Sequence, residues 1–140
     1  MLISDKLKTV LLKDIKIYGN NVKIHTQDQI DRIKKSIEDN SYVQPIAVSK
    51  DNEIVIGTGR YLALKQIDPK MEIEVVDVSG LSADKIKKLR IVDNQLSNIS
   101  DWDKDNLSLE LKKIYTDLED NFEKILDDIG LEEKLIDEMI

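Results

Sequence analysis

The sequence predicts an α+β fold, in which a small body of short strands and helices is followed by an acidic helical tail. Two short apolar runs, residues 46–48 and 54–56, flank the turn-forming stretch Lys50-Asp-Asn52 and predict a hairpin. Several other stretches repeat apolar side chains at helical spacing. Charge divides the chain as well, because residues 1–100 carry a net charge of +2 and residues 101–140 a net charge of −9.

The first predicted helix follows the capping box Thr26-Gln-Asp-Gln29, in which the Thr26 hydroxyl satisfies a free backbone donor. Its apolar stripe consists of Ile30, Ile33 and Ile37. Asn40-Ser41 ends it. Gln44-Pro45 then leads into the hairpin.

A second, short helix is predicted after residues 57–60, and Asp68-Pro69 ends it. Residues 71–78 alternate apolar and acidic side chains, as a partly exposed strand does. Ser82 is a suitable N-cap for a third helix. The apolar stripe of that helix is Ile86, Leu89, Val92 and Leu96.

The C-terminal third has a helical pattern with many acidic residues. Its stripe comprises Leu107, Leu109, Leu111, Ile114, Leu118, Phe122, Ile125 and Leu126. Gly130 is typical of a helix C-cap, and residues 131–140 form a short amphipathic end. The stripe predicts packing on the chain's own body or self-association through the C-terminal helices.

Composition excludes several classes of function. With 140 residues the chain suits one compact domain with an appendage, and with no cysteine it has no disulfide, thiolate metal site or cysteine nucleophile. The apolar runs are too short for a signal peptide or a membrane span, so we expect a cytoplasmic protein with no membrane partner. Proteins that bind nucleic-acid backbones are usually basic, whereas this chain has a net charge of −7. A local basic face on the body of the chain is still compatible with this charge.

The corner Gly57-Thr58-Gly59-Arg60 joins a predicted strand to a predicted helix. Free backbone N–H groups at a helix N-terminus favour phosphate, glycine permits a positive φ and close approach, and Thr58 and Arg60 add donors. The stretch is neither a Walker loop nor a full dinucleotide fingerprint. From spacing alone, a plain turn and an anion site are both open.

A second polar cluster lies in the stretch Arg90-Ile-Val-Asp93-Asn94. On a helix these three polar side chains share a face, which is either a solvated ion pair or a surface that closes over a ligand at the corner. The only tryptophan, Trp102, is expected to be a packing anchor. His25, the only histidine, belongs to a helix entry, and the sequence predicts no metal site.

Taken in order, these motifs resemble the ParB/sulfiredoxin-like superfamily, the "ParB-like nuclease" domain, over about residues 10–103. The resemblance rests on "SIEDNSYVQPIAV", "SKDNEIVIGTGRYLALKQI", "EIEVVDVSGLSADKIKKL" and "RIVDNQLSNISDWD". It is similar above all to the short version from phages and mobile elements that accompanies DNA methyltransferases. The resemblance implies a small mixed sheet with packed helices in residues 1–103 and an acidic helical extension over residues 104–140.

The resemblance also implies a ligand site. Chromosome-partition members bind nucleotide phosphates through a Gly-Glu-Arg-Arg corner, of which only Gly57 and Arg60 match here, and sulfiredoxins need a cysteine that this chain lacks. The expected ligand-binding residues are Gly57, Thr58, Gly59, Arg60, Gln44, Pro45, Arg90 and Asn94.

Three functions are therefore open. The first is a nucleotide- or phosphate-binding module in DNA metabolism, with a nucleotide as ligand, with or without Mg²⁺, and with DNA or a DNA-modifying protein as partner. The second is an enzyme on the same fold (a nuclease, an NTPase or a small-molecule kinase), for which Asp93 is the candidate catalytic residue. The third is a non-catalytic protein-interaction domain.

Overall fold

The computed structural model describes residues 2–19, 24–99, 103–117, 124 and 129. The chain divides into two compact units, Met1–Asn98 and Ile99–Ile140. The first contains the strands β1 (Leu7–Leu11), β2 (Ile46–Val48), β3 (Ile54–Ile56) and β4 (Glu72–Asp77), and the helices α1 (Gln27–Asn40) and α2 (Thr58–Ile67). Helix α3 (Ala83–Ile99) ends one residue beyond the unit boundary, and α4 (Lys104–Asp117) belongs to the second unit.

The four strands form one mixed sheet in the order β1-β4-β2-β3. Strands β2 and β3 pair antiparallel, which confirms the predicted hairpin, and the turn between them is a 3-10 helix, Lys50–Asn52. Strand β4 pairs parallel with β2 and antiparallel with β1. Both the α+β class and the mixed sheet are confirmed.

The helices begin and end where local chemistry predicts. The backbone N–H of Gln29 donates to the Thr26 hydroxyl at 3.2 Å and caps α1. The N–H of Lys85 donates in the same way to the Ser82 hydroxyl at 3.3 Å, ahead of α3. Helix α2 ends at Ile67, with Asp68 as its C-cap directly before Pro69, as predicted.

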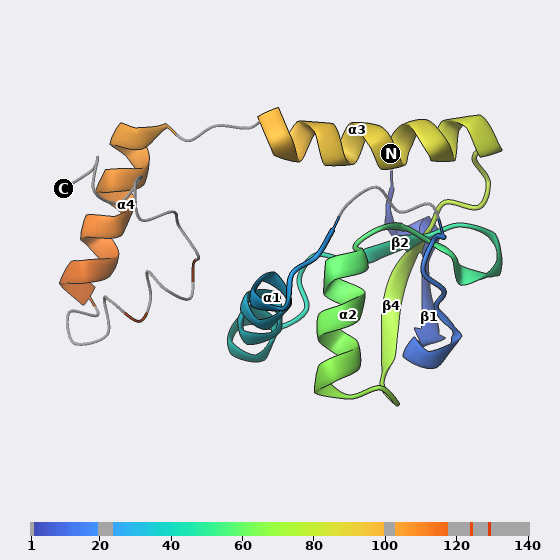
Figure 1. The fold of residues 1–140 in the computed structure, drawn as a ribbon, viewed down its shortest axis with the longest axis horizontal. Helices are drawn as coiled ribbons and strands as arrows, with labels where there is room; N and C mark the ends of the chain where they lie inside the picture. Colours follow the sequence, from blue (N-terminus) through green and yellow to red (C-terminus); the bar gives the residue numbers. More distant parts are fainter. Residues whose placement is uncertain (1, 20–23, 100–102, 118–123, 125–128, 130–140) are drawn as a thin grey trace. The chain divides into compact units, whose positions relative to one another are not determined.

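One side of the sheet is covered by α2, with α1 packed beside it (Figure 1). The core between these layers contains Leu12, Ile15, Ile46, Val48, Ile54, Tyr61, Leu64, Ile73 and Val75. Apolar burial on this scale is the main term that stabilises such a unit. It also fixes the end of β3 against the start of α2, which is where the corner lies.

Two sequence expectations differ from the structure. Strand β1 was not predicted; it is an edge strand whose Leu7 is 39% exposed, so its burial pattern is weak. Val92 was expected on the buried stripe of α3 with Ile86, but it is 50% exposed whereas Ile86 is 9% exposed.

In the second unit, the expected helix is found as α4, where Leu111 is buried and Leu109 is 55% exposed. The N–H of Asn106 donates to the Asp103 carboxylate at 3.1 Å at its start. The predictions for Trp102, Leu118, Phe122, Gly130 and the amphipathic end 131–140 lie outside the described residues. No helix in the described part of the chain has the length and apolar character needed to cross a bilayer.

Candidate phosphate-binding site

The corner between β3 and α2 depends on the backbone conformation of Gly57. Its φ of 104° lies in the left-handed region, which glycine adopts without a Cβ penalty, and it is the N-cap of α2. No side chain caps this helix. The first-turn N–H groups of Thr58, Gly59 and Arg60 have no acceptor within the helix, so the N-terminus of α2 favours an anion.

Arg60 lies in this first turn and contacts the loop that precedes β2. Its Nη1 donates to the Gln44 Oε1 at 3.1 Å, and its Nη2 donates to the Pro45 carbonyl at 3.5 Å. Its Nε is buried and has no hydrogen-bond partner among the described residues. The guanidinium therefore joins the loop to the corner while one of its donors is unsatisfied.

Three effects act on the pKa of Arg60. Burial lowers its pKa from the usual value, and the nearby Tyr42 and Asp93 side chains oppose that shift by raising the pKa. Because the pKa of arginine starts far above neutrality, the guanidinium stays a cation. Asp93, the predicted catalytic candidate, thus favours the charged form of Arg60.

Tyr42 is a site residue that the sequence reasoning missed. Its hydroxyl accepts from the N–H of Ile46 at 2.7 Å and donates to the carbonyl of Glu74 at 2.9 Å. It thereby ties the start of β2 to β4. Burial raises the pKa of Tyr42, so the hydroxyl stays protonated at neutral pH and can donate. The signal available in the sequence was an aromatic residue two positions before Gln44.

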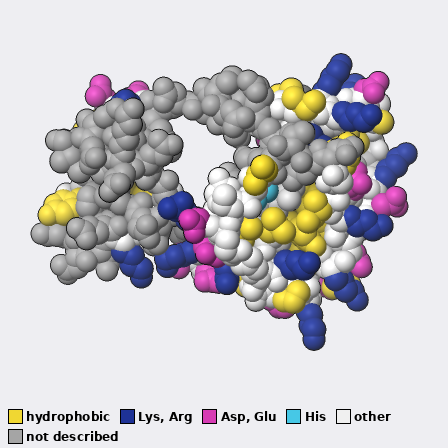
Figure 2. All heavy atoms as spheres, in the orientation of Figure 1, with side chains coloured by type: hydrophobic (Ala, Val, Ile, Leu, Met, Phe, Trp, Pro, Cys, Tyr) yellow, Lys and Arg dark blue, Asp and Glu magenta, His cyan; other side chains and the backbone are white. Residues whose placement is uncertain are grey.

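The second glycine of the corner has a different neighbourhood from Gly57. A Cβ on Gly59 would lie 3.0 Å from Cδ1 of Ile33 and 3.1 Å from Cε1 and Nδ1 of His25. Those two residues belong to α1 and to the segment that enters it. Gly59 is buried, so its lack of a side chain allows α1 to pack closely against α2. Figure 2 shows hydrophobic side chains gathered on one face of the described part of the chain.

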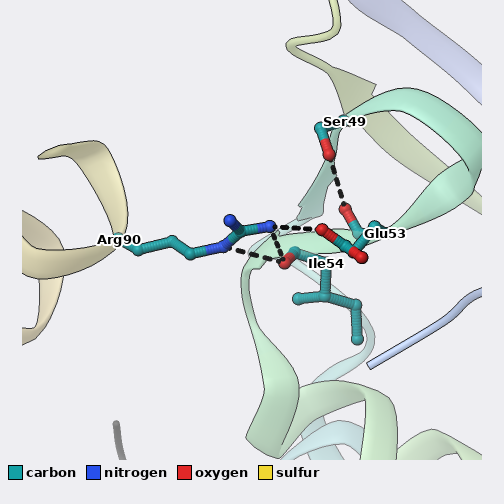
Figure 3. Close-up of polar contacts among 4 residues, drawn as sticks. All are labelled: Ser49, Glu53, Ile54 and Arg90. Atoms are coloured by element: carbon teal, nitrogen blue, oxygen red, sulfur yellow. Dashed lines mark hydrogen bonds and ion pairs between the residues drawn. The ribbon is translucent and has the colours of Figure 1, made fainter. Parts of the chain in front are cut away.

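Arg90 reaches from α3 to the start of β3 (Figure 3). Its Nη2 donates to the Ile54 carbonyl at 2.9 Å and to Glu53 Oε1 at 3.2 Å, and its Nε donates to the Ile54 carbonyl at 3.3 Å. The guanidinium also stacks on Tyr18, with 3.6 Å from Cζ to the ring centroid. The Arg90 side chain is only 12% exposed. These contacts hold α3 against the hairpin.

The structure brings only part of the predicted set into contact with Arg60. Gln44 and Pro45 contact it directly, and Gly57 leaves the space beneath it. Arg90 contacts the hairpin instead, and Asn94 lies on α3 with only its backbone described. Their ligand-binding roles stay predictions. Within the described ranges, no group of three or more His, Cys, Asp or Glu side chains could hold a metal ion.

Comparison with known proteins identifies the family. No family model matches the chain. Over 83 residues the chain is 30% identical to the ParB-like nuclease domain-containing protein YnaK of Escherichia coli (strain K12), a segment that covers 57% of this chain and 93% of that protein. The chain belongs to the ParB-like nuclease domain family. The superfamily resemblance read from the motifs is confirmed.

Two solved structures share the ParB-like fold. The C-terminally truncated chromosome-partitioning protein ParB from Caulobacter crescentus, complexed with CTP-gamma-S, matches with a TM-score of 0.71 and 18% identity, over 95% of this chain and 76% of that one. A Pnob8-like ParB-N domain matches with a TM-score of 0.53 and 19% identity, over 80% of this chain and 45% of that one. At these identities the likeness shows the fold alone.

Proposed function

We propose that the chain is a ParB-like module that binds the phosphates of a nucleotide and serves DNA metabolism. One observation carries the proposal: a partly buried guanidinium, Arg60, lies in the uncapped first turn of α2 with its Nε unsatisfied. A phosphate at this turn would accept from the first-turn N–H groups and from Arg60. Thr58 adds a hydroxyl at the same turn.

CTP is the first nucleotide to test, since the Caulobacter crescentus ParB structure is complexed with CTP-gamma-S. Only Gly57 and Arg60 of the partition corner are kept here, so ATP, GTP and UTP are tested beside CTP. We propose that Gln44 and Pro45 line the site and that Asn94 and Arg90 adjoin it. The observed contacts of Arg90 favour a positioning role.

The proposal is tested by titration calorimetry of the full chain with CTP, ATP, GTP and UTP, each with and without Mg²⁺. Wild type is expected to bind at least one of them. Arg60→Ala is expected to lose the binding and Arg60→Lys to keep part of it, because lysine keeps the charge without the fork. The matched control is Arg32→Ala, an exposed arginine on α1. No binding by wild type, or equal binding by Arg60→Ala, refutes the proposal.

A phosphoryl-transfer or hydrolytic enzyme is the second candidate. The observation that favours it is the closeness of Asp93 to Arg60, since such chemistry needs a carboxylate beside the phosphate. Nucleotide turnover that Asp93→Asn abolishes, with binding retained, would raise this candidate above the first. A non-catalytic interaction domain is the third candidate, and it predicts neither binding nor turnover.

The cellular setting is a proposal of the same kind. We propose a cytoplasmic protein from a phage or mobile element, working beside DNA or a DNA-modifying protein such as a methyltransferase. We further propose that residues 1–103 act as the binding domain and that residues 104–140 extend it or mediate self-association. Light scattering of the full chain over a concentration series tests the last point.

A further inference from the structure

The side chain of Arg60 turns back over the start of its own helix. A Cβ on Gly57 would lie 3.0 Å from Nη2 of Arg60 and 3.3 Å from its Nε. From this position Nη1 reaches Gln44 Oε1 and Nη2 reaches the Pro45 carbonyl. The two acceptors precede Arg60 by 16 and 15 residues. The guanidinium therefore holds together two segments that are distant in sequence.

Within the described residues, two of the five N–H donors of this guanidinium are used by the protein itself. Nη1 and Nη2 each donate to the protein itself, and Nε is buried. A phosphate that binds an arginine well takes two parallel N–H donors from one edge of the guanidinium. A phosphate that takes the pair Nη1 and Nη2 therefore competes with Gln44 and Pro45 for these two nitrogens.

Gln44 is the acceptor that leaves more readily. Its contact comes from an exposed, rotatable side chain, whereas Pro45 contributes a backbone carbonyl next to β2. A neutral amide oxygen is also a weaker partner for a cation than a phosphate oxygen. Exchange of Gln44 for phosphate is therefore favourable, while its loss without a replacement is not.

We propose that Gln44 is a latch that holds the Arg60 guanidinium in the ligand-free protein and that an anion at the α2 N-terminus displaces it. This inference rests on the proposed function. Anion binding then frees the exposed side chain of Gln44. The release stops at Tyr42, because its hydroxyl stays bonded to Ile46 and Glu74. The site thus transmits its occupancy to one short surface loop.

The latch is tested first without ligand. Nitrogen-15 relaxation of the Arg60 Nε–H group reports how far the guanidinium is ordered. Gln44→Ala is expected to lower that order clearly below the wild-type value. The matched control is Gln66→Ala, which removes another exposed glutamine whose partner is Gln27 rather than Arg60. Unchanged order in Gln44→Ala overturns the latch, whatever the protein binds.

The second test titrates CTP and inorganic triphosphate into the same proteins. Because the competing acceptor is gone, Gln44→Ala is expected to bind about two- to tenfold more tightly than wild type, the range expected for one net hydrogen bond. Gln44→Glu is expected to bind more weakly, since a carboxylate holds the guanidinium more firmly. Weaker binding by Gln44→Ala identifies Gln44 as a direct ligand contact and overturns the latch. No binding by any form, Gln44→Ala included, refutes the proposed function, and the relaxation result then decides on the latch separately.

Discussion

Replacement of Arg90 by methionine is the most direct test of how α3 is held against the hairpin. Methionine keeps a long apolar stem but removes every donor. The Ile54 carbonyl then loses both of its hydrogen bonds from Arg90, Glu53 loses its ion pair and Tyr18 loses the stacked cation. Since Arg90 is 12% exposed, water replaces these contacts only in part.

The magnitude follows from these three contacts. Charge-assisted hydrogen bonds to the Ile54 carbonyl contribute about 1.5–3 kcal/mol. The ring contact with Tyr18 adds about 0.5–1 kcal/mol. The Glu53 side chain is 40% exposed, so its ion pair contributes only about 0–1 kcal/mol. Because such terms do not simply add, we expect Arg90→Met to lower the free energy of unfolding by about 3 kcal/mol.

Urea unfolding of the full chain, followed by far-ultraviolet circular dichroism, measures this loss. Arg90→Lys is expected to lie between wild type and Arg90→Met, because lysine keeps the charge but cannot reach both Ile54 and Glu53 with a planar fork. Arg32→Met serves as the control on an exposed site. A loss of under about 0.5 kcal/mol in Arg90→Met, the range of neutral surface changes, would refute the reasoning.

Four further substitutions test other contacts of the first unit. Gly57→Ala is expected to cost about 1–3 kcal/mol in urea unfolding because of its positive φ, and to weaken nucleotide binding by displacing Arg60. Gly59→Ala, in contrast, is expected to cost about 1–3 kcal/mol by overpacking against α1, and the better helix propensity of alanine offsets about 1 kcal/mol of this cost. Binding is expected to stay unchanged, and weaker binding would place Gly59 in the ligand site instead. Tyr42→Phe is expected to lose about 1–3 kcal/mol by leaving two backbone groups without their partner, and equal midpoints in urea would count against that role. Asp77 gives the pH dependence: hydrogen bonds from Ser79 hold its pKa below the usual range, so its carboxylate stabilises the fold above about pH 4 and this contribution disappears as the pH falls through the lowered pKa. Asp77→Asn should therefore flatten the acid side of the stability–pH curve, and an unaltered curve would contradict the assignment.

Much of the fold was predictable because its signals are local. Thr26 and Ser82 cap the starts of α1 and α3 with their side chains, and Asp68-Pro69 ends α2. Each of these signals involves only a few neighbouring residues. The hairpin is likewise a local feature of residues 46–56. Strand β1 carries no such signal. Its partner β4 lies more than sixty residues away, and the edge position leaves Leu7 exposed. The strand is therefore defined by its hydrogen bonds to β4 and not by an alternating apolar pattern in the sequence.

For the candidate site, the sequence could suggest residues but not how they are arranged. The corner, Gln44 and Asp93 were expected together, and the structure puts them around Arg60. The sequence could not indicate that Arg90 takes partners 36 and 37 positions earlier, because long-range contacts depend on the packing of α3. The hydroxyl of Tyr42 was missed for the same reason, since its acceptor Glu74 lies on β4, 32 residues later.

The two glycines of the corner illustrate how one motif combines separate requirements. Gly57 needs its positive φ and leaves the space that the Arg60 guanidinium occupies, so it acts on the ligand-binding side chain. Gly59 faces α1 and His25, so it acts on helix packing. A Gly-x-Gly pattern whose glycines both served ligand approach would tolerate neither substitution in a binding assay. Here only the first position is tied to Arg60, so loss of binding in Gly57→Ala together with unchanged binding in Gly59→Ala is the decisive result for this corner.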